Sequence, residues 1–587
     1  MAKEKREWTK AQSAAIETTD KDLLVSAAAG SGKTATLTER IIRSITKKEA
    51  PSDISKMLVV TFTRAAASEL RQKIFKAVSE ALAADPTNDY LASQLIKLEN
   101  ANICTIDSFY FDILRENASS LGLVQNMRIA DTSESAILAR QIMDETVTDF
   151  YNTDTERFSR FAESFVNVRG MSRLPEILLD LYSNISSYPE GIEFLRSSAE
   201  QCFAGADGDF FECSFGKVLK RETVNKTKYF IAQLEDIVDE MSLDEELEKK
   251  YLPSFAYDLS FCKDLLISLE GENGYSAARA QLGSYSPIKL KSLSNATEFS
   301  LFAKDTRTKI TKEITALSKK AFGLSSDAIC EAMRETARIT LVLHETLESF
   351  ERRLLDEKMQ RSMFDFDDIR RFVMKLLVDE KGEPTETARN ISERYTDIYI
   401  DEYQDVDRVQ DMIFRSISKG NNRFMVGDIK QSIYGFRGAE PDVFADYRRR
   451  FPLHESDKAK DSANEVIFMS NNFRCDENII LFTNRVCSYL FGLCAESIGY
   501  SAEDDLVFSK KKPSDDYVSQ KVRIAVMVPP EDEDSDYKSS AENNREAEAL
   551  YIASEISRLL AKGKKADGTR IEASDIAIMF RSGNMKE

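Results

Sequence analysis

Short, uninterrupted apolar runs recur along the chain, and each ends in small or polar residues that lead into helical spacing. The clearest runs occupy residues 23–25, 57–63, 397–400 and 423–428, with further ones beginning at 102 and 466. Continuous apolar runs bounded by turn residues are typical of strands buried on both faces, as in a parallel sheet. Their alternation with helices predicts an α/β fold. A last run at 574–582 predicts one more buried strand.

From about residue 121 to 364 the pattern changes, and apolar positions recur at helical spacing with few strand signals. The clearest helical segments lie at 133–149, 218–247 and 325–359. Because the strand–helix alternation stops before this region and resumes after it, the region is predicted to be a helical insertion.

The composition is that of a globular protein, since 42% of the 587 residues are apolar and 30% are charged. A single core stops growing beyond about 250–300 residues, so the length requires several structural units. No run approaches the ~20 apolar residues of a membrane span, and the first residues lack the apolar stretch of a secretory signal. We therefore expect a cytoplasmic protein with no membrane segment.

Cysteine and histidine usage excludes several kinds of site. The eight cysteines include no Cys-x-x-Cys pair, and the two histidines, His344 and His454, lie in no recognisable constellation. A zinc or iron–sulfur centre and a Ser-His-Asp triad are therefore not predicted. The net charge of −19 argues against a simple basic nucleic-acid binder. A groove of an acidic protein can still be lined with cations and backbone N–H groups.

The segment AAAGSGKT follows the first apolar run and precedes a helical pattern. Strand, small-residue loop, Gly-Lys-Thr and helix together are typical of a phosphate-binding loop. Glycines let backbone N–H groups turn toward phosphate oxygens, and the helix N-terminus adds positive potential. The alternative is a small-residue turn with a chance Gly-Lys-Thr. The predicted nucleotide-binding residues are Ala27, Ala28, Ala29, Gly30, Ser31, Gly32, Lys33 and Thr34.

Two adjacent acids, Asp401 and Glu402, follow the apolar run at 397–400. Acids at the end of a buried strand are costly unless they have partners or a chemical role. Asp401, with Thr34, is predicted to hold Mg²⁺, and Glu402 to orient and deprotonate an attacking water. The alternative is a helix N-terminus at which acids are electrostatically favourable.

Other polar and aromatic residues gather near the ends of the predicted strands. Gln12 offers a donor and an acceptor for adenine, although Thr9 and Gln12 could simply begin a helix. Gln431 could sense a γ-phosphate, as could Arg474, which by itself reads as a surface arginine. Aromatics beside cations suit single-stranded nucleic acid, but core packing explains the aromatics equally well. The predicted DNA-contacting residues are Phe62, Thr63, Arg64, Tyr434, Phe436 and Arg437.

Taken in order, these segments resemble superfamily 1A DNA helicases of the UvrD/Rep/RecB type. The shared blocks are Trp8 with Gln12, AAAGSGKT, TFTRAAASEL, IYIDEYQD, VGDIKQSIYGFRGAEP and NNFR. Within this group the resemblance is greatest to the AddA family of helicase–nuclease subunits, through LLVSAAAGSGKTATLTERII, MLVVTFTR, ANICTIDSFYFDILREN and EAEALYIASEI. It covers most of the chain and is weakest in the helical insertion and around residues 500–540.

The resemblance implies a P-loop RecA-like parallel-sheet domain built from residues 1–115 and 361–450. A helical insertion would occupy residues 116–360, and residues 451–587 would form part of a second RecA-like domain. The implied activity is ATP-driven 3′→5′ movement on DNA during double-strand-break repair, with Mg²⁺ as cofactor. The implied partners are single-stranded DNA, duplex ends and an AddB-like second subunit.

The resemblance also implies roles for individual residues. Gln12 would read adenine, and Lys33, Thr34, Asp401 and Glu402 would carry hydrolysis. Gln431 and Arg474 would contact the γ-phosphate, and Phe473 would pack near the base. The DNA track would be lined by the residues predicted above.

Departures from the family pattern limit these implications. Ala27 stands in place of the usual first glycine, Asp107 in place of a frequent histidine, and Phe436 in place of a frequent tryptophan. The family's later helicase blocks, which include a second arginine finger, and its nuclease are not found in these residues. We therefore expect an N-terminal portion that binds ATP weakly and unwinds nothing alone. The alternatives are a stand-alone UvrD-like repair helicase and a non-motor scaffold that binds ATP or DNA.

Overall fold

The computed structural model describes residues 7–123, 127–166, 168–186, 188, 190–201, 203, 208–435, 438–494, 499–510, 521–526, 541–565 and 568–579. The chain divides into two compact units. One combines Met1–Leu121 with Ile369–Glu587, and the other is Gly122–Asp368. The helical insertion therefore begins and ends a few residues later than the expected 116–360.

The first unit is built on a six-stranded sheet in the order β3-β2-β6-β7-β1-β8. All of its pairings are parallel, which confirms the predicted α/β class. Its strands are β1 Asp22–Ala27, β2 Met57–Thr61, β3 Asn102–Thr105, β6 Asp397–Ile400, β7 Arg423–Gly427 and β8 Asn464–Met469.

Helices connect these strands, and several begin at a side-chain cap. Thr63 accepts a hydrogen bond from Ala66 N at the start of α3, and Asp407 forms a capping box with Gln410 at α18. The helices of this unit and its boundary are α1 Lys10–Glu17, α2 Lys33–Thr46, α3 Arg64–Ala84, α4 Asp89–Leu98, α5 Ile106–Asn117, α16 Phe366–Leu377, α17 Glu386–Ser392, α18 Arg408–Ser416, α19 Pro441–Arg450, α20 Asp457–Lys460, α21 Glu477–Cys494 and α22 Ala541–Lys562.

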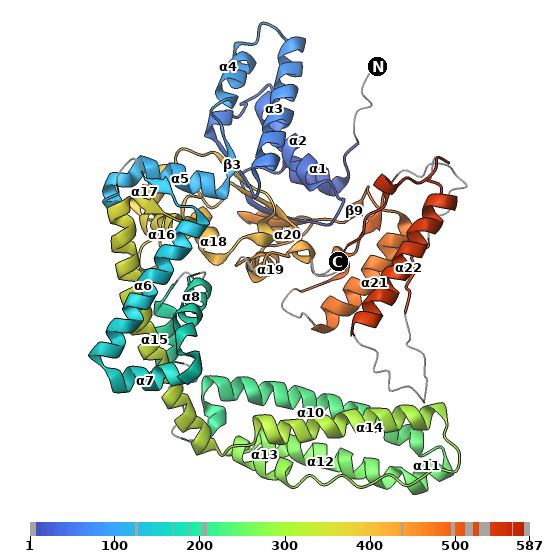
Figure 1. The fold of residues 1–587 in the computed structure, drawn as a ribbon. Helices are drawn as coiled ribbons and strands as arrows, with labels where there is room; N and C mark the ends of the chain where they lie inside the picture. Colours follow the sequence, from blue (N-terminus) through green and yellow to red (C-terminus); the bar gives the residue numbers. More distant parts are fainter. Residues whose placement is uncertain are drawn as a thin grey trace. The chain divides into compact units, whose positions relative to one another are not determined.

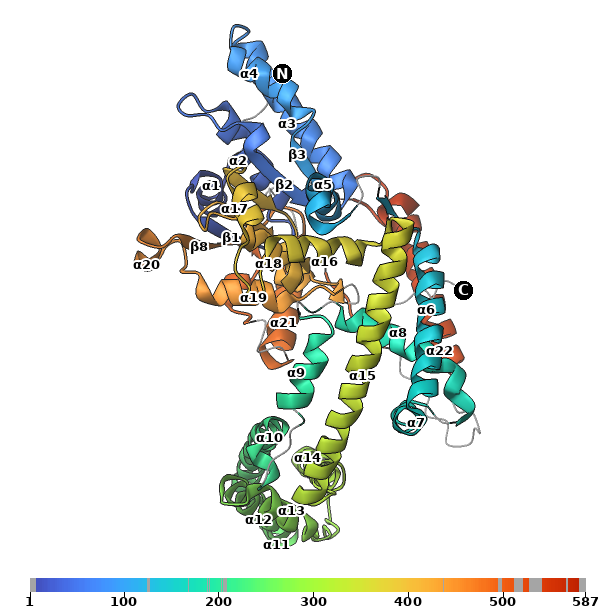
Figure 2. The ribbon, with the colours of Figure 1, turned by 90° about the vertical axis from the view of Figure 1, so that its left-hand side faces the viewer.

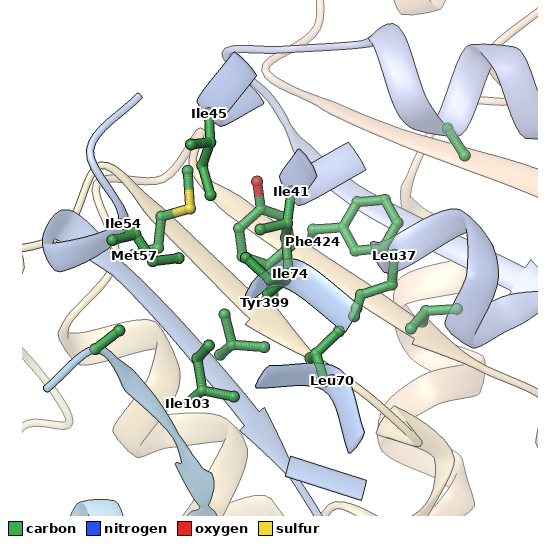
Figure 3. Close-up of a cluster of buried hydrophobic side chains, with 14 of the residues drawn as sticks. Leu37, Ile41, Ile45, Ile54, Met57, Leu70, Ile74, Ile103, Tyr399 and Phe424 are labelled. Atoms are coloured by element: carbon green, nitrogen blue, oxygen red, sulfur yellow. The ribbon is translucent and has the colours of Figure 1, made fainter. Parts of the chain in front are cut away.

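Both faces of the sheet are buried. On one face, Leu37 and Ile41 of α2 and Leu70 of α3 pack with Tyr399 and Phe424 of the sheet (Figure 3). Strand residues alternate in direction, and the intervening positions are also buried although they lie outside this cluster. Burial on both faces explains why these strands are continuous apolar runs in the sequence.

Two expectations for the last part of the chain are wrong. β8, placed by the sequence in a second domain that starts at 451, pairs in parallel with β1 along its whole length. The buried strand predicted at 574–582 is also absent among the described residues up to 579. Ala573–Asp575 is a short 3-10 helix, and Ile578 and Met579 are 47% and 94% exposed. An apolar run becomes a strand only where a neighbouring strand pairs with it.

The second unit is helical. Its helices are α6 Thr132–Thr153, α7 Thr155–Glu163, α8 Leu174–Ile185, α9 Glu193–Gln201, α10 Ser214–Met241, α11 Glu245–Lys250, α12 Leu252–Glu270, α13 Gly274–Gly283, α14 Glu298–Ala316 and α15 Ser326–Arg361. The parallel pair β4 Arg128–Ile129 and β5 Met363–Phe364 joins its first and last segments.

The helices of the second unit enclose two hydrophobic cores. One involves α10 to α14, which lie side by side in Figures 1 and 2, and includes Cys330 and Met333 from the start of α15. The other involves α6 to α9 and includes Leu347 and Phe350 from further along α15. The long helix α15 therefore contributes to both cores.

Candidate nucleotide-binding site

The predicted phosphate loop lies between β1 and α2, at the carboxyl edge of the sheet. Gly30 and Gly32 adopt positive φ values of 70° and 86°, which glycine tolerates without strain. Helix α2 has no side-chain cap, so its first N–H groups remain available to an anion. The hydroxyl of Ser31 is buried and has no hydrogen-bond partner among the described residues.

Gln12 supports the loop from helix α1. Its Nε2 donates to Ser31 O at 2.8 Å, and its Oε1 accepts from Thr9 N at 3.0 Å. Only 2% of Gln12 is exposed. The side chain thus joins the start of α1 to the phosphate loop, and its reading of adenine stays a prediction.

Asn472 supports the loop from the other side, in a role that the sequence analysis missed. It is fully buried in β9 (Asn471–Asn472), and its Nδ2 donates to Ala29 O at 2.7 Å. Phe473 N adds a second bond, to Gly30 O at 3.1 Å. The only signal in the sequence was its position directly before Phe473 and Arg474.

Three predicted catalytic side chains meet in front of this loop. Lys33 Nζ lies 3.0 Å from Glu402 Oε2 and 3.4 Å from Gln431 Oε1. The Lys33 side chain is 12% exposed and that of Glu402 is 39% exposed. Because the three residues follow β1, β6 and β7, parallel packing of those strands brings them to one edge of the sheet.

The acidic turn after β6 has an unusual backbone conformation. Glu402 has φ of 52° and ψ of 43°, in the left-handed region that residues other than glycine rarely adopt. Gln404, a further residue missed in the sequence, donates from Nε2 to Glu402 Oε2 at 3.0 Å and accepts from Asp428 N at 2.9 Å. These contacts tie the turn to the segment after β7.

Asp401 lies at the base of the same turn and is 7% exposed. Its backbone N–H donates to Val60 O on β2. Burial, and next the neighbouring Glu402 carboxylate, raise the pKa of Asp401 to about 6. A nearby divalent cation would favour the ionised form, so the environment fits a metal ligand.

Mg²⁺ is usually held by one or two carboxylates together with phosphate oxygens and waters. Among the described residues, no group of three or more His, Cys, Asp or Glu side chains is placed to bind a metal ion by itself. Thr34, in the first turn of α2, and Asp401 form a sparse donor set of the kind that Mg²⁺ uses with a nucleotide.

Gln431 is held by contacts of its own turn. Its Nε2 donates to Asp428 Oδ2 at 2.7 Å, and Lys430 Nζ lies 3.0 Å from Asp428 Oδ1. Lys430 also approaches Asp504 at 3.4 Å, and Arg448 binds the same carboxylate at 2.6 Å. The Gln431 turn is therefore connected to α19 and to the segment around Asp504.

Phe473 and Arg474 adjoin the phosphate loop through their backbone. Both side chains are exposed, and among the described residues the Arg474 guanidinium has no ion-pair partner. The structure brings the start of this segment to Gly30 but shows no contact between Arg474 and the cluster around Lys33.

The predicted DNA-contacting residues leave the sheet at the same edge as the phosphate loop. Phe62 is half-buried, while Thr63 and Arg64 are exposed at the start of α3. Tyr434, also half-buried, follows the Gln431 turn. Strand β6 separates β2 from β7, so the two segments flank the acidic turn. Phe436 and Arg437 lie outside the described residues.

No helix among the described residues is long and apolar enough to span a membrane. Curated relatives named as ATP-dependent helicase/nuclease subunits of the AddA type include one from Clostridioides difficile (strain 630), 33% identical over 85% of this chain and 40% of the relative. Another, from Clostridium botulinum (strain Alaska E43 / Type E3), is 30% identical over 97% of this chain and 46% of the relative. The chain thus spans less than half the length of these relatives.

The family comparison covers the sheet, the helical unit and every strand end described above. The model of the UvrD/REP helicase N-terminal domain matches residues 8–452. This range includes the phosphate loop, the acidic turn and the Gln431 turn, whose side chains meet in the structure. The chain therefore belongs to the UvrD/Rep helicase family.

Proposed function

We propose that the chain is the ATP-dependent motor portion of a helicase–nuclease subunit that moves 3′→5′ on DNA during double-strand-break repair. The observation that carries this proposal is the meeting of Lys33, Glu402 and Gln431 at the carboxyl edge of a parallel sheet. A cation, a general base and a phosphate-sensing amide are the parts that a phosphoryl-transfer site requires.

The residues of this cluster have separate tasks in the proposed reaction. Lys33 now neutralises Glu402. When Lys33 turns to the β- and γ-phosphates, Glu402 is released to orient water and accept its proton. The N–H groups of the phosphate loop hold phosphate oxygens, and Gln431 and Arg474 contact the γ-phosphate.

Thr34 and Asp401 are proposed to hold Mg²⁺. The ion supplies positive charge to the β- and γ-phosphate oxygens. Gln12 and Phe473 are proposed to contact the base, since Gln12 and Phe473 N both bond to the phosphate loop. Each of these assignments concerns side chains or backbone groups at the same edge of the sheet.

DNA is proposed to pass over the segments after β2 and β7. Phe62, Thr63, Arg64 and Tyr434 supply stacking and phosphate contacts, with Phe436 and Arg437 assigned to the same track. Duplex ends and single strands are the proposed substrates. The names of the relatives describe one subunit of a helicase/nuclease, which supports a second, AddB-like subunit in the proposed assembly.

DNA-stimulated ATP hydrolysis by the complete gene product tests the proposal. We expect hydrolysis to rise when single-stranded DNA is added and to be lost in Lys33→Ala, while Lys73→Ala, an exposed lysine on α3, behaves like the wild type. A 3′-tailed duplex should be unwound and a 5′-tailed duplex should not. ATP or DNA binding without DNA-stimulated turnover would indicate the non-motor scaffold instead. For the 587-residue chain alone we expect weak ATP binding and no strand separation.

A further inference from the structure

Asn472 bonds to two functional segments at once. Its Nδ2 donates to Ala29 O in the phosphate loop at 2.7 Å. Its Oδ1 accepts from Arg474 N at 2.9 Å and from Cys475 N at 2.8 Å. The amide therefore joins the loop to the turn that carries Phe473 and Arg474, although 443 residues separate Asn472 from Ala29 in the sequence.

The fit around this amide is close. A Cβ added at Gly30 would lie 2.8 Å from Asn472 Nδ2 and 3.0 Å from Arg474 Cβ. Asn472 is fully buried, so none of its hydrogen bonds can be replaced readily by water. The close approach explains why position 30 requires glycine, in addition to its positive φ.

The strand that carries Asn472 is itself fixed on both sides. β9 pairs with β10 (Val507–Phe508), and the neighbouring β8 pairs with β1, which leads into the loop. Ala28 N donates to Met469 O at the end of β8. The backbone on both sides of Asn472 is therefore held, and the side chain can transmit a defined geometry to the loop.

We propose that Asn472 is a positioning residue that holds the Ala29–Gly30 peptide and the Arg474 turn in one arrangement. Loss of its Nδ2 donor frees the loop, whereas loss of its Oδ1 acceptor frees the turn. The inference deepens the proposed function, because it rests on nucleotide binding by this loop.

Substitutions at Asn472 separate the two halves of the proposal. Asn472→Ala removes both halves, while Asn472→Asp keeps an acceptor for the turn but places an oxygen against Ala29 O. Asn471→Ala is the matched control, because Asn471 Nδ2 bonds to Ser509 Oγ instead of the loop. Each variant is made in the 587-residue chain, with cooperative thermal unfolding as the check on folding.

Two readouts are measured. Amide hydrogen exchange without nucleotide should become faster at residues 28–31 in both Asn472 variants, and at residues 474–475 only in Asn472→Ala. The dissociation constant for a non-hydrolysable ATP analogue with Mg²⁺ should rise about tenfold in Asn472→Ala, the effect expected for one buried hydrogen bond. Asn471→Ala should match the wild type in both measurements.

Exchange and affinity in Asn472→Ala equal to those of Asn471→Ala would overturn the inference. If Asn472→Ala does not fold, Asn472→Asp decides by the same comparison at residues 28–31. Failure of the wild type to bind the analogue would contradict the proposed function, while the exchange comparison would still test the role of Asn472.

Discussion

Individual residues at the site are held in conformations that their neighbours impose. Glu402 adopts a left-handed backbone, a conformation that costs on the order of 1 kcal/mol or more outside glycine. Gln404 on one side and Lys33 on the other both bind its carboxylate. The strain is therefore balanced by contacts that aim this carboxylate at the phosphate loop.

Glu402→Gln in the complete gene product should keep ATP binding and lower turnover by about 10²–10⁴-fold, because an amide cannot accept a proton. The glutamine Oε1 can still accept from Lys33 Nζ, so the cluster retains its shape. Nucleotide titration and steady-state ATPase rates measure the two effects. Glu69→Gln on α3 is the control, and turnover preserved in Glu402→Gln would remove Glu402 from the role of base.

Gly30→Ala should weaken nucleotide binding through the loop alone. The added Cβ would lie 2.8 Å from Asn472 Nδ2, and alanine at a φ of 70° is strained. Gly283→Ala is the control, because no atom lies within 4 Å of the added Cβ there and its φ is not positive. Equal affinities in the two variants, measured with an ATP analogue, would contradict this account of the loop.

At the scale of elements, a buried ion pair holds the starts of two central strands together. Arg423 on β7 donates from Nε and Nη2 to Asp22 Oδ2 on β1, at 2.9 and 2.6 Å. Asp22 Oδ1 also accepts from Asn422 N and Arg423 N. Since both side chains are buried, the pair sets the alignment of β1, which carries the phosphate loop, with β7, which carries the Gln431 turn.

Asp22→Ala should lower the free energy of unfolding by about 3–5 kcal/mol, because it leaves the Arg423 guanidinium buried without its carboxylate. Urea titration followed by circular dichroism measures the change. Glu69→Ala, which removes an exposed i,i+4 pair with Lys73, should produce no measurable change. Similar midpoints for the two variants would show that the buried pair does not stabilise the sheet.

At the scale of the whole molecule, the helical unit has the features of an independent domain. Its two hydrophobic cores are formed entirely by its own residues. The parallel pairing of Arg128 with Met363 brings the points where the chain enters and leaves close together. An inserted domain with adjacent ends can fold without its host.

Residues 122–368 expressed alone should therefore be helical and should unfold cooperatively, as followed by circular dichroism. They should not bind ATP, because every residue assigned to the nucleotide lies in the other unit. Phe255→Ala, which empties a fully buried position, should lower the free energy of unfolding by about 3–5 kcal/mol. Ile267→Ala, at a position 70% exposed, is the control. Gradual, non-cooperative melting would show that the unit depends on its host.

The parts of the structure that the sequence predicted correctly are those with a local pattern. The strand at 397–400 has the predicted bounds, and the phosphate loop lies between a strand and a helix as its glycines indicated. The helices expected at 133–149 and 325–359 correspond to α6 and α15. Apolar periodicity and glycine placement act over a few residues, so a sequence displays them directly.

The parts that could not be predicted depend on which segments become neighbours. Nothing local distinguishes β8, which joins the sheet, from the run at 574–582, whose described residues pair with no strand. Asn472 and Gln404 likewise looked like ordinary polar residues beside the predicted ones. Their importance comes from partners elsewhere in the chain, at Ala29 and Asp428.

The sequence by itself determined the chemistry available to this protein: a phosphate loop, an acidic pair after a buried strand and aromatic residues near further strand ends. Only the tertiary structure decided which of these groups meet. Lys33 and Gln431 are 398 positions apart, and they approach because β1 and β7 are adjacent parallel strands. Strand order is set by burial of both sheet faces and by pairing across the chain, which no local pattern encodes.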